Sequence, residues 1–337
     1  MDNKINRTRL SNLLAYEWII IIVCIVALIV GWELIYTTAK ADLTFGQTYY
    51  IYYDENMYSS NASVLNDNLK NDGVFSYEVQ KIVSETYVDG SSSAVDVLSL
   101  RIITKEVDMI VTNSIDNSTE QEKAQVRVKS MIDNGAYSVK SIDFMYENAK
   151  NYLAVLLKDG ETDYHDFNNF DKVKIEERFN TRNKKDNRLR HKLISVDDEY
   201  KRIEKLVKDV KTLEKIYEYN DSMSAQNKLF YSYKRYEQSC EFYPENTDYS
   251  ERLSKEQTDN YGINVSALTV SEEKSAKYNK TDFFKYNGLS DSSDAVIIFT
   301  NYIPLSFDFN TSTEYDLEFE KISFITSLVE NFSTILD

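Results

Sequence analysis

The sequence predicts an α/β domain that follows a single N-terminal transmembrane helix, and three observations support this prediction. The first is an uncharged stretch, WIIIIVCIVALIVGW, from Trp18 to Trp32. The second is the alternation of short apolar strands with helical segments over residues 37–160, which is typical of a mixed or mostly parallel sheet with crossover helices. The third is a densely charged section, residues 161–255, that has the periodicity of an inserted helical hairpin or small bundle.

The apolar stretch is long enough to cross a bilayer. As a helix rising about 1.5 Å per residue, residues 13–36 would extend roughly 35 Å across a hydrocarbon core of about 30 Å. Trp18, Trp32 and Tyr36 would then lie at the interfaces that aromatic residues prefer. Residues 1–12 carry three basic side chains and one acidic one, so the positive-inside rule predicts a cytoplasmic tail and an extracellular C-terminal domain.

Cleavage by a signal peptidase is the alternative to a retained signal anchor. A secretory signal has an apolar core of about 7–15 residues and a small-x-small cleavage site. Ala39-Lys40-Ala41 offers such a site, with cleavage after Ala41. The apolar run is long for a signal, and Leu34, Ile35 and Tyr36 extend it, which favours a retained anchor in the cell membrane.

The net charge of −16 belongs entirely to the part after the anchor, because residues 1–36 carry three basic and three acidic side chains. Such an acidic surface repels phosphates, which excludes nucleic acid as a partner. Cys240 is the single cysteine outside the anchor, so no intrachain disulfide can form there. Exterior domains without disulfides are ordinary for many Gram-positive bacteria, and the richness in Asn, Lys, Ile and Tyr suggests an AT-rich genome.

Three extended segments are predicted in the first part of the domain. Thr48–Tyr53 is β-branched and aromatic, Val74–Val83 forms a second extended segment, and Val107–Val111 is a buried parallel strand. Helices are predicted between and after them, over residues 60–69, 94–103, 118–132 and 141–157. This order predicts parallel pairing through crossover helices.

The charged section predicts two helices. Ser195 and Asp198 resemble a capping box, and an apolar stripe at three- and four-residue steps follows, from Tyr200 to Tyr217. A second stripe, Leu229, Tyr233, Tyr236 and Cys240, predicts an antiparallel partner helix. Residues 256–337 then complete the α/β domain with a strand at Ala295–Phe299 and an amphipathic helix at Glu314–Leu336.

The α/β part resembles the type 2 periplasmic-binding-like fold of extracellular solute-binding proteins. The resemblance is carried by Thr48–Tyr53, by Lys105–Val111, by Tyr261–Asn264, and by the last strand with its closing helix. It implies a binding function, and an ABC-type transporter permease as partner. The retained anchor and the charged helices at the place of the second lobe depart from the family. The resemblance therefore does not imply a closing two-lobe ligand trap.

Open α/β sheets bind ligands beyond the carboxyl ends of their strands. This rule nominates residues that follow three predicted strands as contacts for a small solute or peptide: Tyr53, Asp54, Thr112, Asn113, Thr300, Asn301 and Tyr302. The alternative is that Tyr53 packs in the core, and that Asp54 and Asn113 cap helices or turns. A basic run is nominated as an anion- or partner-binding surface, with a solvated helix joint as its alternative: Arg182, Lys184, Lys185, Arg188, Arg190 and Lys192.

No catalytic residue, metal site or cofactor is predicted. The sequence contains no G-x-G-x-x-G, P-loop or G-x-S-x-G motif, and its two histidines lack the spacing of zinc ligands. Asp159, Asp163 and Asp166 are clustered but lack the spacing of an EF-hand. The sequence therefore favours a membrane-tethered, non-enzymatic binding or accessory protein. The alternatives are an envelope interaction protein that works through its helical hairpin, and an anchored hydrolase.

Overall fold

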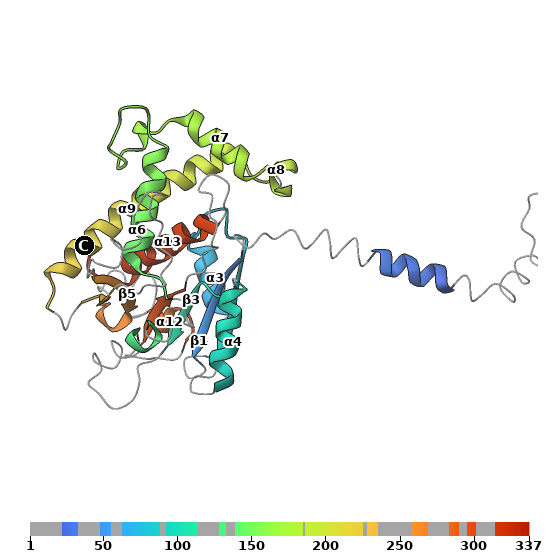
Figure 1. Cartoon of the computed structure of the whole chain (residues 1–337), viewed down its shortest axis with the longest axis horizontal. Coiled ribbons are helices and arrows are strands. Elements are labelled where there is room, and N and C mark those ends of the chain that lie inside the picture. The colour runs from blue at the N-terminus through green and yellow to red at the C-terminus, as the bar shows by residue number, and fades with distance from the viewer. Residues whose placement is uncertain are drawn as a thin grey trace, which may run out of the picture. The chain divides into compact units, whose positions relative to one another are not determined.

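The structure is a computed structural model of the whole chain (Figure 1). It describes residues 22–32, 48–54, 63–87, 92–104, 106–112, 128–132, 139–184, 186–224, 228–234, 258–268, 283–289, 295–300 and 314–336. The chain forms two compact units, Met1–Thr44 and Phe45–Asp337.

In the first unit, residues 22–32 are helical, and the Trp32 side chain is exposed. Trp18 and Tyr36 lie outside the described residues. None of the helices in the described ranges is both long enough and apolar enough to span a bilayer.

The second unit is built on a six-stranded sheet with the order β2-β1-β3-β6-β5-β4. The strands are β1 (Thr48–Asp54), β2 (Lys81–Tyr87), β3 (Met109–Thr112), β4 (Phe230–Lys234), β5 (Thr258–Asn264) and β6 (Val296–Phe299). β1 pairs in parallel with both β2 and β3. The other three pairings, β3 with β6, β6 with β5 and β5 with β4, are antiparallel. The sheet is thus mixed, and the expectation of a mostly parallel sheet was wrong for its second half.

The helices and 3-10 turns lie between these strands. They are α3 (Ser63–Asn71), α4 (Ser92–Ile103), α6 (Ile142–Val155), η4 (Phe167–Asn169), α7 (Lys172–Arg182), α8 (Asn187–Arg190), α9 (Val196–Ser222), η5 (Val265–Ala267), α12 (Phe283–Tyr286) and α13 (Glu314–Phe332). Residues 128–132 are also helical and are the described part of the helix predicted over 118–132.

Alternating side chains of β1 divide the core between the two faces of the sheet, as the two-residue period of a strand requires. Tyr49, Ile51 and Tyr53 pack with α3, α6, α9 and α13 in the larger cluster. Tyr52 packs on the opposite face with Leu98 and Ile102 of α4, and residues 128–132 belong to the same cluster. Both faces of the sheet are therefore covered by helices, which makes a three-layer α/β unit.

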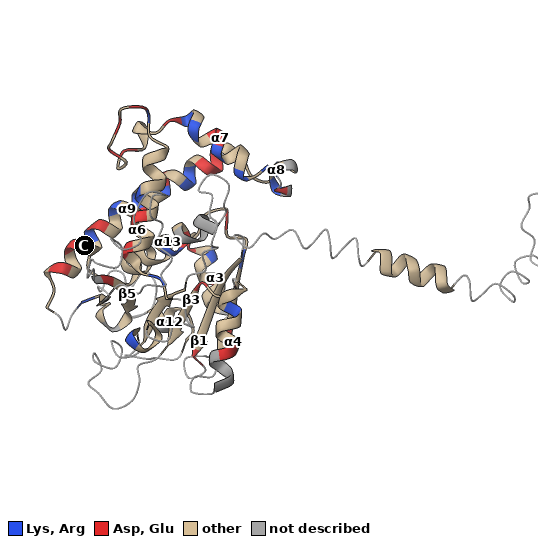
Figure 2. Ribbon diagram, viewed as in Figure 1, with Lys and Arg blue, Asp and Glu red and all other residues tan. Residues whose placement is uncertain are grey.

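The long helix predicted in the charged section is confirmed as α9. The Asp198 carboxylate accepts a hydrogen bond from the backbone N–H of Ser195, as the capping box predicts, and a further one from the Ser195 hydroxyl. α9 packs on α6, α7 and α13. Figure 2 shows that charged residues colour much of α7, α8 and α9, whereas the strands are mostly uncharged.

The predicted partner helix over Leu229–Cys240 was wrong in its described part, because residues 230–234 form β4 and pair with β5. The four-residue step from Leu229 to Tyr233 fits a helix but also the two-residue period of a strand. The aromatic residues of FYSYK favour the strand. The segment predicted as extended from Val74 was also misplaced, because β2 begins at Lys81.

Candidate binding site

A groove of about 360 Å³ lies between α3 and the chain that leads into β2. Its lining includes four apolar side chains, Leu69, Phe75, Val79 and Ile82. Polar and charged residues complete the wall: Asn66, Asp67, Lys70, Ser76, Gln80 and Lys81. A cavity of this size with a mixed lining is typical of sites that bind small molecules or short peptide segments.

The groove lies at the amino ends of the parallel strands. Lys81, in its lining, pairs in register with Thr48, the first residue of β1. Asp54, the last residue of β1, pairs with Tyr87 at the other end of β2. The groove is therefore at the opposite end of these strands from the carboxyl edge at which ligand contacts were predicted.

Residues 74–80 form a wall between the groove and the charged helices. Phe75, Ser76, Val79 and Gln80 line the groove. From the same segment, the Tyr77 hydroxyl donates to Glu199, at 2.6 Å. The segment therefore connects the groove with the interior of the helical layer.

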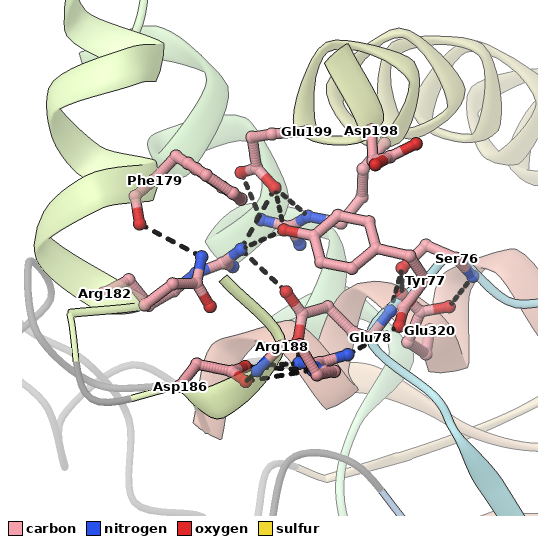
Figure 3. A network of polar contacts seen from close by, with 12 residues as sticks. Ser76, Tyr77, Glu78, Phe179, Arg182, Asp186, Arg188, Asp198, Glu199 and Glu320 are labelled. Atoms are coloured by element: carbon pink, nitrogen blue, oxygen red, sulfur yellow. Dashed lines mark hydrogen bonds and ion pairs between the residues drawn. The ribbon is translucent and has the colours of Figure 1, made fainter. Parts of the chain in front are cut away.

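A buried ionic network holds this wall in place (Figure 3). The Arg182 Nη2 lies 2.8 Å from the Glu78 Oε1 and 3.0 Å from the Glu199 Oε2. Arg188 reaches the other oxygen of Glu78, at 3.3 Å, and also pairs with Asp186, at 2.7 Å. Two arginines from the chain around α7 and α8 thus bind the same glutamate of the groove wall.

Glu199 is the centre of the network. It accepts from Arg182 and from Arg202, whose Nη2 lies 2.8 Å from the Glu199 Oε1. Burial alone would raise the pKa of the Glu199 carboxyl, but the charges of Arg182 and Arg202 hold it well below its usual range. Glu199 is therefore an ionised carboxylate that organises two guanidinium groups.

Glu320 of α13 fixes the groove wall from the other side. Its carboxylate accepts hydrogen bonds from the backbone N–H of Ser76, at 2.8 Å, and from the Ser76 hydroxyl, at 2.5 Å. Burial raises the pKa of the Glu320 carboxyl above its ordinary value, although the bonds from Ser76 oppose this shift. The wall is thus tied to both α9 and α13.

Among the predicted ligand contacts, Asp54 and Thr112 lie at the carboxyl edge of the parallel strands, where β1 and β3 are neighbours. Both residues are buried. The Tyr53 side chain is fully buried in the core, which agrees with the packing alternative for this residue. Asn113, Asn301 and Tyr302 lie outside the described residues.

β6 runs antiparallel to β3, so its carboxyl end lies at the opposite end of the strands from Asp54 and Thr112. The reason is its direction: Phe299 pairs with Met109, the first residue of β3, and Val296 pairs with Thr112. Thr300, directly after β6, donates from its backbone N–H to the Asp108 carbonyl, at 3.1 Å. The strand ends used in the prediction therefore do not meet at one end of the sheet, because β6 is antiparallel to β3.

The predicted basic surface is divided between the interior and the exterior. Arg182 and Arg188 point into the ionic network, whereas Lys184 and Lys192 are exposed. Lys185 is outside the described residues, and the side chain of Arg190 is likewise not described. Asp186, two residues from Arg188, is the one local partner. The other carboxylates lie far away in the chain, at Glu78, or in the next helix, at Glu199, and for these the sequence carried no signal.

The three clustered aspartates do not converge on a common point. Asp159 pairs with Lys174, at 2.9 Å, whereas Asp163 accepts from His165 and Asp166 accepts from Asn168. Within the described ranges, no group of three or more His, Cys, Asp or Glu side chains has an arrangement that could hold a metal ion.

Comparison with known proteins adds no relative: no protein-family model, no curated protein and no solved structure matches this chain.

Proposed function

We propose that this chain is a membrane-tethered, extracytoplasmic binding or accessory protein without catalytic activity, and that its ligand enters the groove beside α3. The observation that carries the proposal is the groove itself. It combines apolar side chains such as Phe75 and Ile82 with exposed charged ones such as Lys70. Its wall is fixed from behind by the buried carboxylates Glu78, Glu199 and Glu320.

A fixed wall supports a binding role because ordering a flexible wall would reduce affinity. Loop and side-chain ordering costs free energy on association, and a wall that is already in place avoids this cost. In the network, carboxylates of the wall and of α9 are each matched by guanidinium groups. Such paired groups hold position, which suits binding better than proton transfer.

The cellular setting of the proposal comes from the N-terminal sequence. The apolar stretch over residues 13–36 and its basic N-terminal flank support a single-pass anchor in the cell membrane, with residues from about 40 onward outside the cell. The resemblance to extracellular solute-binding proteins supports association with an ABC-type transporter permease. The chain would then deliver or sense a ligand close to the bilayer.

Binding in the groove is tested with the full chain in detergent micelles. Thermal unfolding is followed by circular dichroism in the presence of sugars, amino acids and short peptides, since a ligand that binds the native state raises the midpoint. With one of these ligand classes we expect a saturable rise in the thermal midpoint, and we expect the Lys70→Glu variant to lose this rise. Lys201→Glu on α9, at a side chain that is 77% exposed, is the matched charge reversal outside the groove and should keep the rise. No rise with any class would contradict the proposal.

The anchor is tested separately by cell fractionation. We expect the full chain in the membrane fraction, with its C-terminal part digested by protease added to intact cells. Substituting two leucines or isoleucines of the apolar stretch by aspartate should release the chain from the membrane, because charges at the bilayer centre oppose insertion. Recovery of the unaltered chain in the soluble fraction would contradict the proposed membrane anchor.

A second candidate function is supported by one observation. The connection between α8 and α9 exposes Leu193, which is 73% exposed, beside the exposed Lys192. Covering this leucine would remove apolar surface from water, which would favour contact with a protein partner and make the chain an envelope interaction protein. Leu193→Ser with Lys192→Glu should abolish capture of that partner and leave the thermal response to groove ligands unchanged.

A further inference from the structure

β2 is an edge strand, and the groove begins at its first residues. Among the described residues, β1 is the single strand that pairs with β2. The side chains of Lys81 to Thr86 are all half-buried or exposed. An edge strand presents backbone N–H and C=O groups that can pair with a further strand. The structure therefore places backbone hydrogen-bonding groups directly beside a groove, and one of them, the Ile82 carbonyl, accepts a hydrogen bond from the Asn66 Nδ2, at 3.4 Å.

The side chains of β2 show which face of an added strand would meet the groove. Ile82 lines the groove, and two residues later the Ser84 hydroxyl donates to Asn66 of α3, at 2.5 Å. On the other face, Glu85 accepts from the Tyr52 hydroxyl, at 2.8 Å. Because side chains alternate along a strand, every second side chain of a strand added to β2 would face α3.

The lining of the groove indicates which side chains that strand should carry. Leu69, Phe75, Val79 and Ile82 offer apolar surface, and Lys70 is exposed on α3. The charged lining residues are Asp67 and Lys70 of α3 and Lys81 of β2. Because Lys81 alternates with Ile82, its side chain projects to the other face of β2, and Lys70 is the cation on the α3 side. The groove thus suits apolar side chains together with an acidic one, whereas a basic segment would find less complementarity.

We propose that the occupant of the groove is an extended peptide segment of a partner protein, which adds to β2 as a further strand. Its backbone pairs with the outer edge of β2, and alternate side chains enter the groove: apolar ones onto Phe75, Val79 and Ile82, and a carboxylate toward Lys70. This inference rests on the proposed function and specifies its ligand. Strand addition gains affinity from backbone bonds and specificity from pockets for alternate side chains, and both features are present here.

The test uses the full chain in detergent micelles and a fluorescently labelled heptapeptide, Thr-Val-Thr-Glu-Thr-Val-Thr, whose valine and glutamate side chains share one face. We expect saturable binding by fluorescence anisotropy and slower backbone hydrogen exchange over residues 81–86. The counterpart with lysine in place of glutamate should bind about tenfold more weakly. Lys70→Glu should reverse this preference, and Lys201→Glu should leave it unchanged.

Backbone pairing is tested by methylating peptide nitrogens. In a strand, alternate N–H groups point to opposite edges, so methylation of the threonine nitrogens and methylation of the valine and glutamate nitrogens remove donors from different edges. We expect one of these two peptides to lose binding and the other to retain it. Equal binding by both would overturn strand addition, even if groove residues were protected.

The outcomes separate this inference from the proposed function. If a sugar or amino acid stabilises the chain in a Lys70-dependent manner and the heptapeptide does not bind, the proposal that a peptide adds to β2 is overturned. The proposal that the groove binds a ligand then stands. If no class of probe binds, both the strand-addition inference and the proposed binding function are overturned. Binding of the acidic heptapeptide with protection of residues 81–86 and dependence on one set of nitrogens would support both.

Discussion

Arg182 and Glu199 form an ion pair across the contact between α7 and α9, with 3.0 Å between the Nη2 and Oε2 atoms. Each side chain is 1% exposed. The same guanidinium nitrogen binds Glu78 of the groove wall, at 2.8 Å. The pair therefore joins α7 and α9 to the distant segment around Glu78, behind the candidate binding groove.

Replacing Arg182 should destabilise the chain strongly. Arg182→Met would leave the buried carboxylates of Glu78 and Glu199 without this cation, and breaking a buried ion pair in this way costs about 3–5 kcal/mol. Lys184→Met, at an exposed position of the same basic run, should change the free energy of unfolding by less than about 0.5 kcal/mol. Urea unfolding at neutral pH measures both. Equal effects of the two substitutions would contradict an interior role for Arg182.

Glu199 should make stability sensitive to acid. Its folded pKa lies below the ordinary value of 4.5, so its interactions contribute fully above pH 4.5 and are lost as the pH falls through the folded pKa. Glu199→Gln cannot titrate. We expect this variant to be less stable than the unaltered chain by about 3 kcal/mol at neutral pH, with a difference that narrows below pH 4.5. Urea midpoints from pH 7 to pH 3 measure this, and a constant difference would contradict it.

Glu320 should have the opposite pH dependence. Burial raises its folded pKa above the ordinary value of 4.5, so its ionisation reduces stability as the pH rises through the folded pKa. Glu320→Gln removes this ionisation and keeps an oxygen that can accept from the Ser76 N–H. Relative to the unaltered chain, this variant should gain stability between pH 4.5 and neutral pH. A relative loss of stability over that window, measured by the same urea series, would refute the assignment.

An added side chain at Gly262 of β5 should destabilise the chain. Its φ of 71° is in the left-handed region, and an added Cβ would lie 3.2 Å from the Ile297 carbonyl oxygen and 3.3 Å from the Val296 Cγ1. Gly73→Ala is the matched control, because Gly73 has a φ of 63° but nothing within 4 Å of the added Cβ. We expect both to lose about 1 kcal/mol from backbone strain, and Gly262→Ala to lose a further 1–3 kcal/mol from crowding. Thermal midpoints of the two variants measure these losses. Similar losses in both would contradict the prediction, because they would show that the neighbours of Gly262 move to make room for the added Cβ.

The start of α9 should depend on its capping box. Asp198→Ala removes the acceptor of the Ser195 backbone N–H, at 3.0 Å, and of the Ser195 hydroxyl, at 2.8 Å. We expect a loss of about 1 kcal/mol and faster hydrogen exchange in the first turn of α9. Asp197→Ala, in the same turn, serves as the control for the loss of one negative charge. If both variants lost the same stability, charge and not the capping bonds would explain the effect.

The sequence by itself determined the elements whose signals are local. The β-branched and aromatic run at Thr48–Tyr53 became β1, and Val107–Val111 contains the start of β3. The helix at 141–157 begins after its cap Ser141, and the Ser195 capping box starts α9. These features were predictable because caps, short apolar runs and helical periodicity each act within a few residues.

Only the tertiary structure decided how distant segments meet. It made the last three strands antiparallel, turned the segment at 230–234 into a strand, and drew Arg182 and Arg188 inward from a basic run toward Glu78. It also formed the groove from α3 and the entry to β2, which carry no shared motif. The physical reason is that strand pairing and burial of charge depend on which partners folding brings together, and the partners of Arg182 are 17 and 104 residues away in the chain.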